Sequence, residues 1–222
     1  MWAFEGQPDG AAYVAHLDSA ERGVLLDLVD QVVELLGGPE RTWSSGEPAD
    51  GGGTAGNTDP FLRLSIDLAP VHAPDDPALR RLLPDASRED PSVSAEFRRL
   101  TEADLRSGKV ANLLALRAVL DAARPSAVVA AADAAGVAAA LTDVRLVLSE
   151  RLGIRTDDDA DRLADLAWAD GAPQDRAAAV ARFLATLYLM LTALQDSLVE
   201  LMLATLPEAG RPAGGAPGTR AR

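Results

Sequence analysis

Lys109 is the only lysine in a chain that also carries 20 arginines, and it lies within a segment of helical periodicity. On a helical wheel with about 100° per residue, Lys109 and Asn112 fall between Leu105, Leu113 and Leu116 on the expected inward face. Burial of a lysine is costly unless an acid faces it, so we expect an acidic partner. We favour a structural ion pair, or a lysine side chain that reaches solvent at the edge of the helix packing. A reactive amine remains the alternative hypothesis.

A second candidate residue is Arg145, which lies at the edge of an apolar helical stripe. Asp143 falls well round the helix from Arg145, so the two need not share a site. Arg145 could pair with an acid such as Glu96, or it could bind an anion through two parallel hydrogen bonds. A salt bridge between packed helices is the structural alternative. The predicted ligand-binding pocket consists of Arg98, Lys109, Asn112 and Arg145, with Glu96, Asp104 and Asp143 as candidate ion-pair partners.

Familiar catalytic and metal-binding motifs are missing from the sequence. The chain has no cysteine, which excludes disulfides, thiol catalysis and cysteine-ligated zinc. The acidic run that starts at Asp157 is not a calcium-binding loop, because Arg162 and Trp168 stand where a glycine and a glutamate are needed. His16 and His72 are the only histidines, and there is no phosphate-binding loop or nucleophile elbow. We therefore predict no cofactor, no metal site and no catalytic residue.

The charge of the chain argues against a nucleic-acid or membrane-surface partner. The formal net charge is -13, so the overall field repels polyanions. Basic residues are concentrated between 78 and 120, where eight basic and six acidic side chains leave a local charge of +2. Arginine pairs at 80–81 and 98–99 lie there, but acids are interleaved and no aromatic platform accompanies them. Nucleic-acid binding is therefore the least favoured hypothesis.

Periodicity and capping signals predict a mainly α-helical fold with a small β-hairpin within residues 2–17. Helices are expected over 19–36, 77–83, 91–100, 102–123, 126–152, 156–168 and 173–206, with a capping box at Thr101 that starts the fourth. The Gly-, Ser- and Pro-rich composition of 44–59 predicts a mobile loop. Residues 62–68 alternate like a strand, and 207–222 are expected to form a disordered tail. Residues 1–206 would then form a single-domain helical bundle with a long C-terminal core helix.

The last predicted helix, 173–206, is the most apolar of all. Its residues 177–194 match the length of a membrane span, but Arg182 within them and Asp196 and Glu200 after them are typical of a buried soluble helix. We expect no secretory signal at the N-terminus and a cytoplasmic protein. At 1.5 Å per residue the helix would be about 50 Å long, so part of its apolar stripe could serve a homodimer. A central helix enclosed within a monomer is the alternative.

Three segments share a pattern with one known family: Asp76–Ala86, Glu96–Arg106, and Thr142–Leu148 with the following Arg151–Gly153. They resemble domain of unknown function two thousand and seventeen, an uncharacterised family of high-GC Gram-positive bacteria. The resemblance extends to about residue 206 and implies that the arginine-rich stretch and the Asp143/Arg145 segment belong to a shared core, without implying an activity. Residues 44–59 and 61–74 depart from the pattern, which puts any site there in doubt. Family members are often encoded beside the Clp-protease adaptor that recognises destabilising N-terminal residues, so a Clp-related partner is implied by neighbourhood alone.

The function that these observations favour is a non-catalytic cytoplasmic binding or regulatory protein, with a protein or a small anionic ligand as its partner. Its basis is the grouping of basic residues near an apolar face, together with the lack of a recognised catalytic motif. An enzyme that uses Lys109 as a base or nucleophile is the alternative. A DNA-associated regulator is a less favoured third hypothesis.

Overall fold

Three short strands and six helices build the described part of the chain, which comprises residues 3–38, 73–122 and 126–205 of a computed structural model. In chain order they are β1 (Phe4–Gly6), β2 (Ala12–His16), α1 (Ser19–Leu35), α3 (Pro77–Leu82), α4 (Pro91–Ala122), β3 (Ser126–Ala130), α5 (Ala134–Leu152), α6 (Asp157–Ala167) and α7 (Arg176–Ala204). The prediction of a mainly helical fold with an N-terminal hairpin and a long C-terminal helix is confirmed. The predicted loop 44–59, strand 62–68 and tail 207–222 lie outside the described residues.

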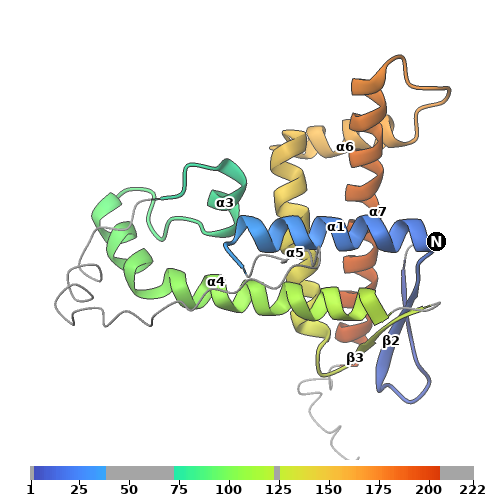
Figure 1. The fold of residues 1–222 in the computed structure, drawn as a ribbon, viewed down its shortest axis with the longest axis horizontal. Helices are drawn as coiled ribbons and strands as arrows, with labels where there is room; N and C mark the ends of the chain where they lie inside the picture. The colour runs from blue at the N-terminus through green and yellow to red at the C-terminus, as the bar shows by residue number, and fades with distance from the viewer. Residues whose placement is uncertain (1–2, 39–72, 123–125, 206–222) are drawn as a thin grey trace, which may run out of the picture.

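The main helices form two crossing pairs (Figure 1). α1 runs beside α4, and α5 and α7 pass across them, with α6 near one end of α7 and the small sheet near the other. α5 packs against α1, α3, α4, α7 and β3, so it occupies the centre of the fold. The sequence suggested the last helix for that place. α7 instead packs against α5, α6, β1 and β2 and covers one side of the centre.

The sheet is antiparallel, in the order β1-β2-β3. β1 and β2 form the predicted hairpin, in which Phe4 lies opposite Ala15. β3 pairs with the other edge of β2, so the prediction of a helix that starts at 126 is wrong. Val128 and Val129 are β-branched, and their alternating exposure suits a strand with one buried face. The helix begins only at Ala134.

α4 is one continuous helix of 32 residues, so the predicted break at Thr101 is also wrong. The hydroxyl of Thr101 donates to the carbonyl oxygen of Phe97, one turn earlier, instead of capping a new helix. Arg98, Glu102 and Arg106 form two successive ion pairs at i,i+4 spacing across the same point. Such pairs stabilise an uninterrupted helix, and here they outweigh the local preference of threonine for a helix start.

The predicted starts of three other helices are confirmed by their N-caps. The Asp18 carboxylate accepts hydrogen bonds from two amides in the first turn of α1, and the Glu21 side chain accepts one from the Asp18 amide. Asp76 caps α3, and Thr156 caps α6. These bonds satisfy first-turn amides that have no helical carbonyl to bond, so they determine where each helix begins.

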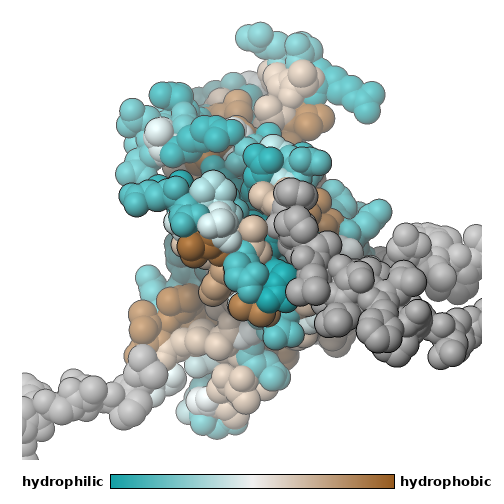
Figure 2. All heavy atoms as spheres, turned by 90° about the vertical axis from the view of Figure 1, so that its left-hand side faces the viewer, coloured by the Kyte–Doolittle hydropathy of each residue, from teal (hydrophilic) through white to brown (hydrophobic). Residues whose placement is uncertain are grey.

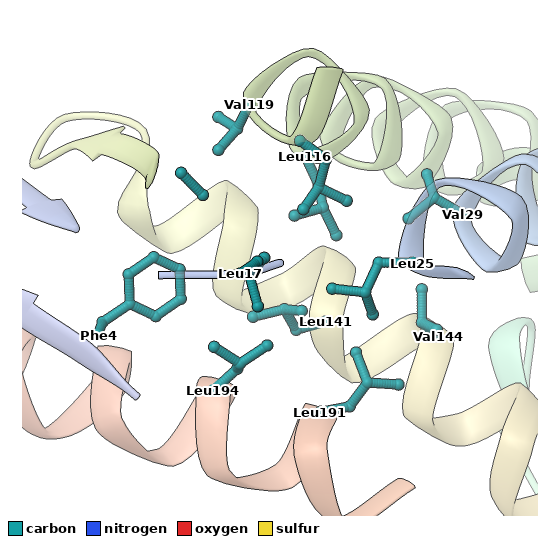
Figure 3. A pocket seen from close by; sticks show the side chains of 12 residues that line it. Phe4, Leu17, Leu25, Val29, Leu116, Val119, Leu141, Val144, Leu191 and Leu194 are labelled. Atoms are coloured by element: carbon teal, nitrogen blue, oxygen red, sulfur yellow. The ribbon is translucent and has the colours of Figure 1, made fainter. Parts of the chain in front are cut away.

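The core lies where α1, α4, α5, α7 and the sheet meet (Figure 3). Leu25 from α1, Leu116 from α4, Leu141 and Val144 from α5 and Leu191 from α7 point toward one shared volume. That volume contains a void of about 20 Å³ lined only by apolar residues. Such a void has room for about one water molecule and offers it no polar partner, so it is not a ligand site.

α7 is the one helix in the described ranges that is long and apolar enough to cross a membrane, by length and composition alone. The core helix of a soluble protein meets the same criterion. Within its most apolar window, 28% of the residues are buried inside the fold, so α7 buries one face and leaves others accessible. Figure 2 shows the opposite side of the molecule, the left-hand side in Figure 1, where mostly hydrophilic residues cover the upper part and apolar areas lie lower down. The cytoplasmic location stays a prediction.

Candidate functional site

Lys109 on α4 has the acidic partner that its burial demands, and this partner is Asp143 on α5. Lys109 Nζ donates a hydrogen bond to Asp143 Oδ1 over 2.6 Å. The Asp143 side chain is 4% exposed and that of Lys109 20%, so the carboxylate is buried while the ammonium reaches the rim. Burial raises the pKa of Asp143, and the bond from Lys109 opposes that shift. The ion pair therefore links α4 to the central helix.

This contact favours a structural role for Lys109. An ammonium that donates to a carboxylate carries a proton where a nucleophile needs its lone pair. The hypothesis of a catalytic base or nucleophile can be tested by lysine-selective labelling near neutral pH, since the chain has a single lysine. An unreactive Lys109 would count against it.

Asn112 lies where α4 and α5 approach each other closely. A Cβ added to Gly136 of α5 would be only 3.0 Å from Asn112 Oδ1. The missing side chain at Gly136 therefore makes room for α4. Leu105, which the helical wheel placed on the same inward face, is exposed. The apolar inward face of α4 is formed by its C-terminal half, where the buried residues are Leu113, Leu116 and Leu120.

Gly108→Ala in α4 should stabilise the protein by about 0.5–1 kcal/mol, because alanine is the better helix former. A Cβ at Gly108 would meet nothing within 4 Å. Gly136→Ala should gain clearly less, because its Cβ would press on Asn112. Urea unfolding of both variants beside the parent protein measures the difference. An equal gain at the two positions would contradict the close approach of α4 and α5.

Arg98 lies in a separate ion-pair cluster near the start of α4. Its guanidinium donates to Glu102 Oε2 (2.6 Å), to Asp85 Oδ1 (2.8 Å) and to the carbonyl oxygen of Leu83 (3.3 Å). Burial acts to raise the pKa of Glu102, but the hydrogen bonds from Arg98 and Arg106 lower it below the ordinary value. Glu102 is therefore ionised at neutral pH and compensates the buried Arg98. The cluster ties the segment after α3 to α4.

Arg145 on α5 differs from these pairs because no carboxylate in the described part of the chain neutralises it. Its Nη1 donates to Gln195 Oε1 (2.6 Å), and Gln195 Nε2 donates in turn to Thr142 Oγ1 (2.6 Å). The guanidinium carbon lies 5.3 Å from the centre of the Tyr188 ring, within the range of a cation–π interaction. Arg145 Nε is buried and has no hydrogen-bond partner among the described residues. A buried donor without a partner costs about 1–3 kcal/mol, so an acceptor that reached it would be favoured.

A cleft of about 350 Å³ opens beside Arg145 between α3, α5, α6 and α7, and we term it the Arg145 cleft. Its lining residues are Arg81, Thr142, Arg145, Leu146, Ser149, Ile154, Arg155, Thr156, Asp157, Ala160 and Tyr188. Glu150 binds both Arg81 (2.8 Å) and Arg155 (3.0 Å) at this cleft. Three arginines thus face two carboxylates, Glu150 and Asp157, and the cleft is net positive in a chain of charge -13. Its volume is typical of small-molecule sites, which span about 300–1,000 Å³.

The four residues predicted to share a pocket are not brought together in either of the hollows that Arg98 and Arg145 line in the described part of the chain. Arg145 lines the Arg145 cleft, whereas Arg98 lines a different hollow near the start of α4. Arg98 and Lys109 lie eleven positions apart on one helix, which separates them by about 16 Å along its axis. Asn112 lies against Gly136. The predicted pocket is therefore reduced to Arg145 and the neighbours that tertiary packing supplies.

The candidate ion-pair partners have three different outcomes. Asp143 pairs with Lys109 and is not among the residues that line the Arg145 cleft. Glu96 pairs with Arg99 on its own helix (2.7 Å), so the suggested pair with Arg145 is wrong. Asp104 is exposed and forms no ion pair with another described residue.

The sequence interpretation missed Tyr188 and Gln195 as partners of Arg145. They lie seven positions apart on α7, which is about two turns, and so share one side of that helix. That spacing was a usable signal, because two polar-tipped side chains along an apolar helix predict a polar neighbour. Arg81 and Arg155 reach the cleft from α3 and from the turn before α6. No local spacing connects them to Arg145.

The model of a protein family described as domain of unknown function (DUF2017) matches residues 1–202. No curated protein and no solved structure gives a significant match.

Proposed function

The chain belongs to the family described as domain of unknown function (DUF2017), for which the description gives no activity. We propose, from the geometry of the site, that it is a non-catalytic protein that binds a small anionic ligand in the Arg145 cleft. The anion is a carboxylate or phosphate group held by Arg145. A regulatory role in the cytoplasm is part of the proposal and rests on the sequence.

The observation that carries this proposal is that Arg145 lines a net positive cleft while no carboxylate among the described residues pairs with its guanidinium. The planar guanidinium matches carboxylate and phosphate oxygens and can bind them through two parallel hydrogen bonds. Gln195 and Tyr188 already hold the side chain in one orientation. Binding would therefore cost little additional side-chain entropy.

The other lining groups support binding more than catalysis. The hydroxyls of Thr142 and Ser149 already donate to backbone carbonyls of α5. Among the described residues, the lining includes no histidine and no cysteine. The cleft thus supplies charge and shape, without a nucleophile placed beside a base. Leu146, Ile154 and Ala160 give it an apolar part that could cover the body of a ligand.

Arg145→Gln should weaken the binding of a small anion at least about tenfold, because a hydrogen bond to a charged group contributes about 1.5–3 kcal/mol. The measurement is a titration of isotope-labelled protein with inorganic phosphate and, separately, with benzoate, followed by backbone amide shifts. We expect the shifts to concentrate on residues 142–157 and 188. Arg145→Lys should fall between the parent and Arg145→Gln, because it keeps the charge and loses the planar fork.

Arg162→Gln is the matched control. Arg162 lies on α6, pairs with Asp159 and does not line the cleft. Its replacement changes the net charge by the same amount and should leave the affinity unchanged. Shifts spread over all exposed arginines, or an equal effect of Arg162→Gln, would mean that the anions sense only the general charge of the surface.

A further inference from the structure

A second concave surface lies on the side of α7 that faces away from the core. It is an apolar groove of about 550 Å³, which we term the α7 groove. Its lining residues are Ala3, Trp168, Leu189, Ala193, Asp196, Ser197 and Glu200. None of them lines the Arg145 cleft, so this surface is independent of the proposed anion site.

The apolar part of the α7 groove is unusually open to solvent. Trp168, at the C-terminal end of α6, is 69% exposed. Leu189 and Ala193 form the α7 side of the groove beside it. An exposed tryptophan next to a concave apolar surface is typical of a protein-binding site, because its ring supplies a large area for a partner to cover. Ala193 is small, so the backbone of a partner can approach α7 closely.

Two acids, Asp196 and Glu200, border this apolar surface. They are exposed, and neither forms an ion pair with another residue of the described ranges. They lie at i,i+4 spacing on α7, where like charges repel each other and slightly destabilise the helix. A cation placed between them would remove that repulsion, so the charge of the groove selects a basic partner.

We propose that the α7 groove docks a basic amphipathic α-helix of a partner protein. From Leu189 to Glu200 the groove extends about 16 Å along α7, which is the length of three helical turns. Apolar residues on one face of the docked helix cover Trp168 and Leu189, and flanking lysine or arginine side chains pair with Asp196 and Glu200. This is the helix-in-groove mode of recognition, in which residues at i, i+3 and i+7 act as anchors.

A second copy of this chain fits the groove less well. A two-fold interface would present the same surface from both sides and bring four of these acids together. Each copy also has a net charge of -13. The homodimer that the sequence suggested for the last helix would therefore need a face of α7 other than this groove.

The fluorescence of Trp168 gives a direct test. The chain has three tryptophans, so Trp2→Phe and Trp43→Phe leave Trp168 as the single reporter in the full chain. The probe is a designed three-turn helical peptide of leucine, alanine and lysine, with lysines flanking a leucine face. We expect it to shift the Trp168 emission to shorter wavelength as the ring leaves water. Two control peptides carry glutamate in place of lysine, or the same residues in an order that scatters the leucines.

Asp196→Asn with Glu200→Gln should weaken the binding of the lysine peptide about three- to tenfold and reduce its salt dependence, because two exposed ion pairs are lost. Asp104→Asn with Glu96→Gln, an equal charge change on α4 outside the groove, should leave binding unchanged. No emission shift with the lysine peptide, or equal shifts with either control peptide, would overturn the proposal. A blue shift of the protein alone with rising concentration, matched by dimers in sedimentation, would overturn it in favour of a second copy.

Discussion

Replacing Lys109 with methionine should destabilise the protein by about 2–4 kcal/mol at neutral pH. Methionine keeps an apolar stem of similar length but removes the ammonium, so the buried carboxylate of Asp143 loses its partner. Breaking a fully buried ion pair from one side costs about 3–5 kcal/mol. The cost is lower here because the side chain of Lys109 is 20% exposed and water can reach the vacated position. Urea unfolding at pH 7 measures the loss.

The loss should also depend on pH in a direction that identifies Asp143. Burial holds the pKa of Asp143 above its ordinary value of 3.8 in spite of Lys109, and removal of Lys109 raises that pKa further. An acid whose pKa rises on folding stabilises the folded state below its unfolded pKa, and that contribution is lost as the pH rises through the folded pKa. Lys109→Met should therefore differ least from the parent protein near pH 4 and most near pH 8.

The double variant Lys109→Met/Asp143→Asn is the control for this effect. It removes the titrating acid together with its partner, so its difference from the parent should lose most of its pH dependence. It should also be less destabilised than the sum of the two single changes, because each single change leaves one charge without its partner. A pH-independent loss in Lys109→Met would show that Asp143 is not the group that Lys109 compensates.

The need of Lys109 for an acid could be predicted from the sequence, but the identity of that acid could not. The need follows from one residue on one helix, since a buried ammonium is costly wherever it lies. Asp143 belongs to another helix, and its position opposite Lys109 depends on how α4 crosses α5. For the same reason, the sequence could not show that the residues of the predicted pocket lie apart in the fold. A helical wheel shows that Arg98 and Lys109 lie on the same side of α4. It does not show that they lie at different positions along the helix axis, where different elements pack against α4.

The two errors in the predicted helices have different causes. At Thr101 the residues that resemble a capping box include Glu102, whose bonds to Arg98 and Arg106 bridge the expected break. The i,i+4 pattern was visible in the sequence and could have decided the question. At β3 the deciding partner is remote: Ser126 hydrogen-bonds to His16, 110 positions away. Alanine-rich composition favours a helix in any local window, and only sheet pairing overrides it.

Leu191→Ala should cause the largest loss of stability, about 3–5 kcal/mol. Leu191 is 1% exposed and points from α7 into the volume shared with Leu25, Leu141 and Val144 (Figure 3). A void of about 20 Å³ already lies there, and the truncation would enlarge it between helices that cannot collapse inward without disturbing their other contacts. The midpoint of urea unfolding should fall while the slope of the transition stays the same.

Leu203→Ala is the matched control, because it makes the same change on the same helix at a side chain that is 59% exposed. It should change the free energy of unfolding by no more than about 0.5 kcal/mol. The difference between the two variants tests which face of α7 is buried in the fold. A helix surrounded by lipid, or one that buried a different face in an assembly, would not respond more at Leu191 than at Leu203.

The Arg145 cleft uses Tyr188 and the α7 groove uses Ala193, so both surfaces depend on the core face of α7 holding that helix in place. Equal losses in the two variants would remove the structural basis of both proposals at once.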